Sequence, residues 1–192
     1  MSTIVMLGGN GYIGRNVTRK WMSADPHAEF VVVSRSGNNK VVSDRVKSVS
    51  ADCSDFDAVN AVIPEKVDYI LDFVGRPVKD SAEFKKINDQ PAEVMLRIAE
   101  EKGVKAMGFI GGTLGDKAFV QGKKRIADKL KASGIRTEVV NPTLVYGNGR
   151  NDMMSKAVPL LRFFGLFSKK LKPVDVNVVA NEMVRKMMSD EN

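Results

Sequence analysis

Three glycines near the start of the chain, Gly8, Gly11 and Gly14, have the spacing of a turn that binds phosphate. They stand between an apolar run of strand length and a stretch of helical period. Glycine lets the backbone approach a pyrophosphate and adopt positive φ, and the following helix points its first amides at the anion. A lone glycine triplet is a weak signal, but this position predicts a dinucleotide-binding turn. The alternative is a tight turn without a ligand.

Gly11 is followed directly by Tyr12 and Ile13, whose backbone amides would be the first of the helix to bind the phosphates. The side chain of Tyr12 has a second interpretation, as a packing residue. Both interpretations stay open at the level of the sequence.

The end of the second apolar run bears on which dinucleotide fits. An acid there would bind the ribose 2′-hydroxyl of NAD, whereas an arginine accommodates the 2′-phosphate of NADP. The sequence reads VVVSRSG, so that Ser34 and Arg35 occupy the position and no carboxylate does. A planar, permanently charged guanidinium suits a phosphate group. These residues favour NADP, with NAD as the alternative. The interpretation without a function is that Arg35 is simply an exposed arginine at a strand end.

The elements that must position these residues alternate between short apolar runs and longer stretches of helical period. This is the pattern of βαβ units, and it predicts an α/β fold with a Rossmann-type, doubly wound parallel sheet. We expect strands at 3–7, 29–35, 46–50, 67–75, 104–112 and 136–142. We expect helices at 12–22, after an N-cap at Ser54 or Asp55, at 80–102 as one helix or two joined near Pro91, and at 116–132, 155–167 and 178–190.

Length and composition narrow the class of protein. The 192 residues fit a single domain, 1–192, in which 143–192 form a short C-terminal extension on the substrate side. No apolar run approaches the ~18 residues of a membrane span, and no secretory signal pattern precedes the first strand, so we expect a cytoplasmic protein. One cysteine, Cys53, and one histidine, His27, argue against an internal disulfide and the usual zinc sites, so no metal is expected. The net charge of +7 is spread over most helices, and no nucleic-acid partner is expected.

Five segments together resemble the short-chain dehydrogenase/reductase superfamily, in its extended or atypical branch of epimerase/dehydratase-like and NmrA-like proteins. GGNGYIG matches the glycine motif, ADCSD follows the third strand, DFVGRP ends the fourth, NPTLVYGNG follows the sixth, and KPVDVNVVANEMV leads into the last helix. The likeness covers nearly the whole chain and implies a Rossmann fold that binds NAD(P). It also implies cofactor contacts from Asp52 and Cys53 to the adenine, from Phe73, Val74 and Gly75 to the ribose, and from Pro142, Thr143 and Val145 to the nicotinamide.

The catalytic residues of that superfamily are mostly missing. Active members place a tyrosine four residues before a lysine, on the helix after the fifth strand, and a serine at the end of that strand. The tyrosine is acid or base to the carbinol, the ammonium lowers its pKa, and the serine orients the substrate oxygen. Here Phe119 stands four residues before Lys123, and Gly111 and Gly112 stand where the serine pair is expected. Thr113 is the nearest hydroxyl.

Two functions follow from this mixture. The first is an NADP-dependent oxidoreductase or epimerase/dehydratase-like enzyme of atypical mechanism, which acts on a small carbonyl or alcohol with Lys123 and Thr113 as its candidate catalytic residues. The second is an NADP(H)-binding sensor or regulatory protein without turnover. The missing hydroxyls favour the second, whereas atypical members of the superfamily often remain reductases, and on balance we narrowly favour the first. Lys123 has two further interpretations, as a ligand of the nicotinamide ribose and as one lysine of a basic helix face.

The sequence does not decide the oligomeric state or the role of the segment near the end of the chain. The phenylalanine-rich segment 158–167 is interpreted as a helix that covers the sheet, as a pocket lid, as a dimer face or as a membrane-surface segment. Dimers of the superfamily commonly use the helices predicted here at 81–102 and 116–132, so a homodimer is one arrangement that the resemblance allows.

Overall fold

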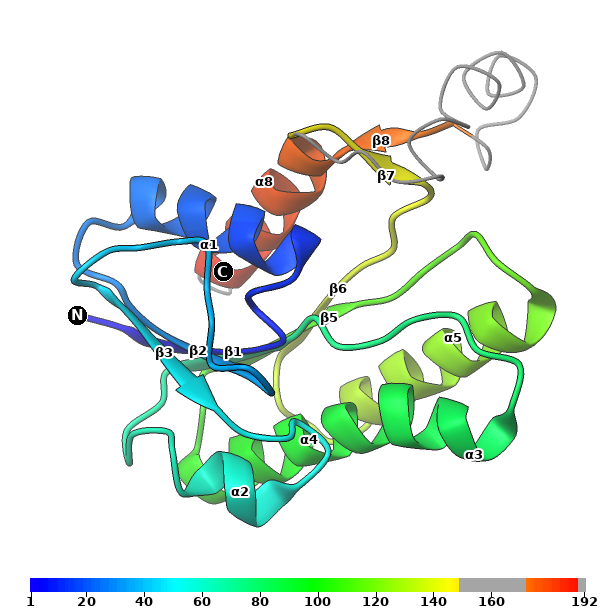
Figure 1. Ribbon diagram of the computed structural model, residues 1–192, viewed down its shortest axis with the longest axis horizontal. Coiled ribbons are helices and arrows are strands. Elements are labelled where there is room, and N and C mark those ends of the chain that lie inside the picture. Colours follow the sequence, from blue (N-terminus) through cyan, green and yellow to red (C-terminus); the bar gives the residue numbers. More distant parts are fainter. Residues whose placement is uncertain (149–171, 190–192) are drawn as a thin grey trace.

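A six-stranded, all-parallel sheet forms the centre of the molecule in a computed structural model, which describes residues 1–148 and 172–189. Its strands run in the order β3-β2-β1-β4-β5-β6 (Figure 1). Their bounds are Thr3–Leu7 (β1), Glu29–Ser34 (β2), Val46–Ser50 (β3), Tyr69–Asp72 (β4), Ala106–Ile110 (β5) and Thr137–Val140 (β6). The strand order reverses between β1 and β4, which confirms the predicted Rossmann-type, doubly wound sheet.

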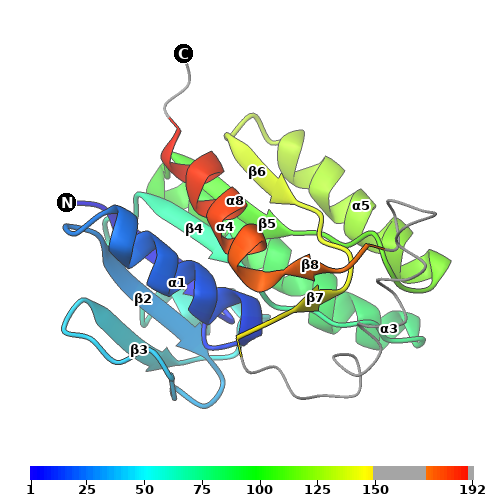
Figure 2. The same cartoon turned by 90° about the horizontal axis from the view of Figure 1, so that it is seen from above.

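Helices cover both faces of this sheet. Figures 1 and 2 show α1 (Tyr12–Ala24) and α8 (Val176–Met188) side by side on one face, and the other face carries α2 (Phe56–Asn60), α3 (Ser81–Phe84), α4 (Gln90–Lys102) and α5 (Lys117–Lys131). One apolar core, which includes Trp21 and Met183, lies under α1 and α8, and a second, which includes Met95 and Phe109, lies under α4 and α5. Because both faces are covered, β1 and β5 are continuous apolar runs and not alternating ones.

Most predicted elements are confirmed, with differences at their ends. The fourth strand ends at Asp72 and the fifth at Ile110, so the predicted strands at 67–75 and 104–112 are too long. The residues beyond these ends belong to loops at the carboxyl edge of the sheet. Asp55, and not Ser54, caps α2 by accepting a hydrogen bond from the N–H of Ala58. The helix predicted at 155–167 lies outside the described residues, as does the segment 158–167.

The helix predicted at 80–102 is divided by a π-helical turn. α3 leads into this turn, Lys85–Asp89, and α4 follows it with Pro91 in its first helical turn. Proline has no N–H to donate, and its ring clashes with the carbonyl four residues earlier, so it is tolerated only at such a boundary. The junction therefore lies just before the proline, as the two-helix alternative predicted.

A small second sheet was missed by the sequence analysis. β7 (Val145–Tyr146) pairs in parallel with β8 (Val174–Asp175), and β8 leads directly into α8. Two-residue strands are too short to show any periodicity. The pairing brings the segment after β6 next to the start of the last helix.

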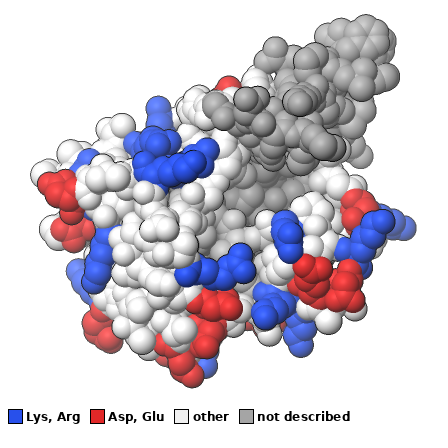
Figure 3. All heavy atoms as spheres, viewed as in Figure 1, with Lys and Arg blue, Asp and Glu red and all other residues white. Residues whose placement is uncertain are grey.

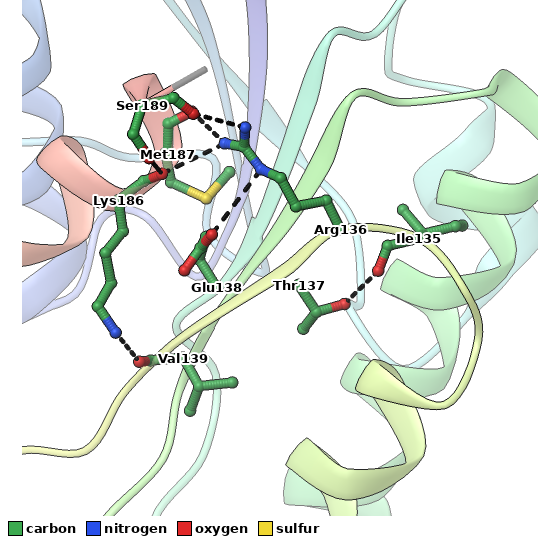
Figure 4. Close-up of polar contacts among 8 residues, drawn as sticks. All are labelled: Ile135, Arg136, Thr137, Glu138, Val139, Lys186, Met187 and Ser189. Atoms are coloured by element: carbon green, nitrogen blue, oxygen red, sulfur yellow. Dashed lines mark hydrogen bonds and ion pairs between the residues drawn. The ribbon is translucent and has the colours of Figure 1, made fainter. Parts of the chain in front are cut away.

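The C-terminal end of α8 is bound to the edge of the main sheet (Figure 4). The guanidinium of Arg136, just before β6, donates to the carbonyls of Ser189 and Met187, each at 2.6 Å, and to that of Lys186 at 3.2 Å. Lys186 returns a hydrogen bond from Nζ to the carbonyl of Val139 at 2.9 Å. Cations at this end of a helix satisfy its last carbonyls and its dipole.

Basic and acidic side chains lie interspersed over the face seen in Figure 3. Within 1–148 and 172–189, no helix is both long enough and apolar enough to cross a membrane.

Candidate functional site

A pocket of about 540 Å³ opens at the carboxyl ends of β1, β2, β3 and β4. Six of the predicted cofactor-binding residues line it, namely Gly8, Arg35, Asp52, Cys53, Val74 and Gly75. They come from four loops that are far apart in the sequence. The pocket lies where β1 and β4 separate at the reversal of strand order, which is where open α/β sheets bind their ligands.

The N-terminus of α1 faces the expected ligand without a cap. Its N-cap residue is Gly11, which forms no side-chain hydrogen bond, and its first turn holds no acid. Four other helices begin with a capping aspartate, which accepts a backbone N–H bond, namely α2 (Asp55), α3 (Asp80), α5 (Asp116) and α8 (Asp175). A carboxylate at α1 would repel a phosphate. The uncapped helix is therefore suited to binding an anion.

The three glycines differ in what they require. Gly8 has φ +67°, and a Cβ there would lie 2.8 Å from Cγ2 of Val74. A Cβ at Gly14 would lie 2.6 Å from Cα of Gly9, so glycine lets the helix pack tightly on the turn. At Gly11, a Cβ would approach only the carbonyl of Gly8, at 3.1 Å. The tight turn therefore gives all three glycines a steric reason, which is strongest at Gly8 and Gly14 and weakest at Gly11.

The side chain of Tyr12 packs, as the second interpretation held. Its hydroxyl donates to the carbonyl of Gly147 at 2.7 Å, and the guanidinium of Arg15 lies 5.5 Å from the centre of its ring. Ile13 is partly buried against the core under α8. Both residues remain in the first turn of α1, where their backbone amides were predicted to meet the phosphates.

The adenosine end of the pocket combines charged and apolar groups. Arg35 is exposed at the end of β2. The N–H and hydroxyl of Ser54, at 3.0 and 2.7 Å, lower the pKa of Asp52, and the charges of Lys86 and Arg35 lower it further. Burial raises the pKa of Cys53 to about 12, so the thiol is an apolar wall and not a nucleophile.

A buried carboxylate, missed by the sequence analysis, supports the loop after β4. Asp72 is 1% exposed, and its Oδ1 accepts a hydrogen bond from the N–H of Val74 at 2.8 Å. Burial raises the pKa of Asp72 to about 6, although the charge of Lys123 opposes the change. Phe73 is partly buried against the core, while Val74 and Gly75 line the pocket. An acid at the end of an apolar strand was the only signal that could have revealed Asp72.

Lys123 lies beneath the same loop. It is 4% exposed, so its interpretation as part of a basic helix face is wrong. Burial lowers the pKa of Lys123, while Asp72 and Asp89 oppose the change. A Cβ at Gly75 would lie 2.6 Å from Oδ1 of Asn88 and 3.1 Å from Nζ of Lys123, which shows that both polar groups converge on this glycine. Nothing in the sequence marked Asn88.

The tyrosine position of the superfamily is filled by a packed side chain. Phe119 is 8% exposed, and its ring contacts that of Phe84 edge-on, with centroids 6.4 Å apart and an angle of 73°. A Cβ at Gly115 would lie 2.9 Å from Cδ1 of Phe119, and one at Gly122 would overlap the ring of Phe84. These glycines make room for the two rings, and the site of the usual acid is part of the core.

The serine positions are equally changed. A Cβ at Gly111 would overlap the side chain of Asn141, so a serine does not fit there in this arrangement. Thr113 is exposed, and its hydroxyl donates to the carbonyl of Pro142 at 3.3 Å. The two candidate catalytic residues thus differ in setting, with Thr113 in solvent and Lys123 buried under the β4 loop.

The residues predicted to contact the nicotinamide follow β6, outside the lining of the pocket: Pro142 and Thr143 lie between β6 and β7, and Val145 is the first residue of β7. The hydroxyl of Thr143 donates to the carbonyl of Lys172 at 2.5 Å. Val145 is 6% exposed and packs in the core with α8. Pro142 is half-buried and accepts the bonds from Thr113.

Metal-ligand types do not cluster in the part of the chain that the structure describes. Within it, no three His, Cys, Asp or Glu side chains lie close enough together to hold a metal ion.

Comparisons with known proteins agree with this fold. The model of the NAD dependent epimerase/dehydratase family matches residues 4–121. No curated protein sequence gives a significant match. Among solved structures, UDP-glucose 4-epimerase of Thermotoga maritima with UDP-glucose is 16% identical with a TM-score of 0.78, over 99% of this chain and 74% of that one.

Two further similar structures contain the cofactor. The Bordetella bronchiseptica enzyme WbmH in complex with NAD+ is 16% identical with a TM-score of 0.73, over 97% of this chain and 72% of that one. UDP-glucose 4-epimerase of Thermus thermophilus in complex with NAD is 14% identical with a TM-score of 0.75, over 98% of this chain and 75% of that one. At these identities the structural similarity shows the fold alone.

Proposed function

The chain belongs to the NAD dependent epimerase/dehydratase family, in the extended short-chain dehydrogenase/reductase superfamily, and we propose that it is an NADP(H)-binding, oxidoreductase-like protein that acts on a small carbonyl or alcohol. The observation that carries the proposal is the pocket at the strand reversal. Gly8, Arg35, Asp52 and Gly75 meet there from four separate loops. Along the strand order β3-β2-β1-β4 these loops carry Asp52, Arg35, Gly8 and Gly75 in turn, which matches adenine, 2′-phosphate, pyrophosphate and the second ribose of a dinucleotide.

A nicotinamide dinucleotide fits the residues that are present. The turn at Gly8 and the uncapped start of α1 would hold the pyrophosphate, and Asp52 would bind the adenine. Arg35 would bind the 2′-phosphate, since no carboxylate stands at the end of β2 to bind a 2′-hydroxyl. Gly75, held over Asn88 and Lys123, would contact the ribose. When bound, the nicotinamide supplies the hydride donor or acceptor.

Any proton transfer to or from the substrate must proceed without the tyrosine that active members of the superfamily use. Phe119 carries no ionisable group and is packed against Phe84, so it does not replace the usual acid. We assign to Thr113, an exposed hydroxyl, the orientation of the substrate oxygen, with water as the source of the proton. Lys123 supports the cofactor loop from below and does not act on the substrate directly.

The cofactor part of the proposal is tested by titrating the protein with NADPH and NADH and measuring affinity by calorimetry. We expect NADPH to bind more tightly. Arg35→Ala should weaken NADPH binding about tenfold, the value of one charge-assisted phosphate contact, and leave NADH binding nearly unchanged. Equal losses for both dinucleotides would reject the role of Arg35. Failure of the native protein to bind either dinucleotide at micromolar concentration would reject the proposed function.

Turnover is tested separately by screening small aldehydes, ketones and alcohols for a change in NADPH absorbance. Thr113→Val, which is close in shape and lacks the hydroxyl, should lower kcat on any substrate found. Tight NADPH binding without turnover across the screen, unchanged in Phe119→Tyr, would favour a cofactor-binding sensor over an enzyme. The observation that favours a sensor is the packed ring of Phe119, which stands where an enzyme of the superfamily has its acid.

A further inference from the structure

We propose that Lys86 is a second residue that selects NADP, by binding the 2′-phosphate of the cofactor from the helical wall of the pocket while Arg35 binds it from the end of β2. The inference rests on the proposed function, because it concerns the same pocket. It adds a residue from an element that the sequence pattern does not connect with cofactor choice.

The π-helical turn Lys85–Asp89 places Lys86 at the pocket. Lys86, Ile87 and Pro91 all line it, so this helical stretch forms one of its walls. The turn is fixed to the loop after β4, since Nδ2 of Asn88 donates to the carbonyl of Arg76 at 3.1 Å. The backbone that carries Lys86 is therefore held in place beside the cofactor loop.

The charges that line the pocket are unbalanced. Three basic residues, Arg35, Arg76 and Lys86, line it with a single acid, Asp52. Arg76 is already paired with Glu83 at 2.9 Å. Neither Arg35 nor Lys86 has an acidic partner within 4.0 Å among the described residues. Two cations are thus available to one bound anion.

Lys86 and Arg35 act on the same part of the pocket. After the hydrogen bonds from Ser54, the charges of Lys86 and then of Arg35 lower the pKa of Asp52. These charge effects agree with the geometry, since Arg35, Asp52 and Lys86 line the same pocket. Both hydrogen bonds from Ser54 go to Oδ1 of Asp52, and no ion pair joins this carboxylate to either cation among the described residues.

A 2′-phosphate matches this arrangement and a 2′-hydroxyl does not. A phosphate monoester carries between one and two negative charges at neutral pH, so a second cation adds affinity after the first has bound. The guanidinium of Arg35 offers a planar pair of donors, and the ammonium of Lys86 offers a point charge that adapts to the remaining oxygens. NAD, with a hydroxyl at this position, gives neither cation an anionic partner.

Lys85→Met provides a matched control for Lys86→Met. Both lysines are exposed, they are adjacent in the same π-helical turn, and only Lys86 lines the pocket. The two variants carry the same net charge. Any general loss of positive potential therefore affects both equally, and a direct contact affects one.

The experiment measures calorimetric affinities of the full chain and its variants for NADPH and NADH, and for two fragments without nicotinamide, adenosine 2′,5′-bisphosphate and 5′-AMP. Lys86→Met should weaken NADPH and the bisphosphate about tenfold and change NADH and 5′-AMP less than twofold. Lys85→Met should change all four less than twofold, and Lys86→Arg should retain the preference. Circular dichroism and thermal melts verify that each variant is folded.

Four outcomes overturn the inference. Equal losses in Lys86→Met and Lys85→Met would show long-range attraction only, and equal losses for NADPH and NADH would place Lys86 at a group common to both. No loss in Lys86→Met, while the native protein prefers NADPH, would reject Lys86 and leave the proposed function standing. Absence of any preference for NADPH in the native protein would reject the proposed cofactor choice together with Lys86.

Discussion

The carboxyl edge of the sheet has two ends that are built in different ways. Over β1 to β4 it is an open pocket with Arg35, Asp52 and Lys86 in its lining. At β5 and α5 the position of the usual acid is filled by the buried ring of Phe119, against Phe84. The contrast places the proposed cofactor pocket and the position of the superfamily's usual acid on separate parts of this fold, so that the two can change independently.

The same contrast appears at two helix starts. α5 is capped by Asp116, which accepts the N–H of Phe119 at 2.8 Å, whereas α1 begins at Gly11 without a cap. A cap satisfies orphan amides within the protein, and an open start leaves them to a ligand. The start of α5 is therefore closed by its own aspartate, and the start of α1 lacks a side-chain cap at the place where we propose that the pyrophosphate binds.

The largest effect is expected at the end of the sheet near β5 and α5, where Phe119 is packed. Phe119→Ala should lower the free energy of unfolding by about 3 to 5 kcal/mol, because it leaves a cavity beside Phe84. Urea denaturation measures this loss, and NADPH affinity of the folded variant should stay within about twofold. A strong loss of NADPH affinity in a protein of unchanged stability would contradict the separation of the two ends.

The second prediction concerns Asp72, which lies under the loop between the two ends. Its pKa is raised by burial from 3.8 to about 6, so between these values the folded state holds a proton that the unfolded chain has lost. The free energy of unfolding should therefore fall as pH rises from about 4 to about 6, by about 3 kcal/mol in total, and stay level above.

In Asp72→Asn the fall in this pH window should disappear. Urea titrations at several pH values give both profiles, and Asp57→Asn, an exposed aspartate in α2, serves as the control that keeps the native profile. Parallel profiles for the native protein and Asp72→Asn would show that Asp72 is not the group responsible.

The third prediction sharpens the role of the open helix start. Gly11→Asp and Gly11→Asn differ only in charge, and both introduce the same tight Cβ approach of 3.1 Å to the carbonyl of Gly8. Gly11→Asp should bind NADPH about 30-fold more weakly than Gly11→Asn, which is about 2 kcal/mol, since its carboxylate repels the pyrophosphate. Equal affinities of the two variants would mean that no phosphate lies at the start of α1.

The smallest effect is expected at the capped start. Asp116→Ala should cost about 1 kcal/mol of stability through loss of the bond to the N–H of Phe119, and Asp116→Asn should recover most of it. Thermal unfolding followed by circular dichroism is sufficient to measure it. A change in NADPH affinity larger than the change in stability would link this end of the sheet to the cofactor after all.

Most of the fold could be predicted from the sequence, and so could the part of the site that lies on the loops after the strands. Strands and helices alternate with strong periodicity, and the loops that carry Gly8, Arg35, Asp52 and Gly75 follow strand ends, so their meeting at one edge was predictable from parallel pairing. Strand ends were less accurate, because apolar residues such as Phe73 continue past Asp72, the last paired residue of β4, into the loop.

The sequence singled out Lys123, but its burial and the polar groups beside it were not predictable. Asp72, Asn88 and Lys123 come from a strand, a π-helical turn and a helix, and their convergence under the loop that carries Val74 and Gly75 depends on how these elements pack. A sequence pattern records faces and ends of single elements, whereas this cluster depends on three elements at once. The same reason hid Lys86, whose approach to the pocket follows from the π-helical turn.

The contacts that bind α8 to the edge of the sheet bear on when this half of the core can form during synthesis. α8 packs against α1, β5 and β6, and Arg136 and Lys186 bind its end to β6. While the ribosome has produced only the strands, this face of β5 and β6 and the side of α1 remain without their cover. The face closes only when α8 emerges, so this half of the core forms late relative to α1, which is synthesised long before its partner helix.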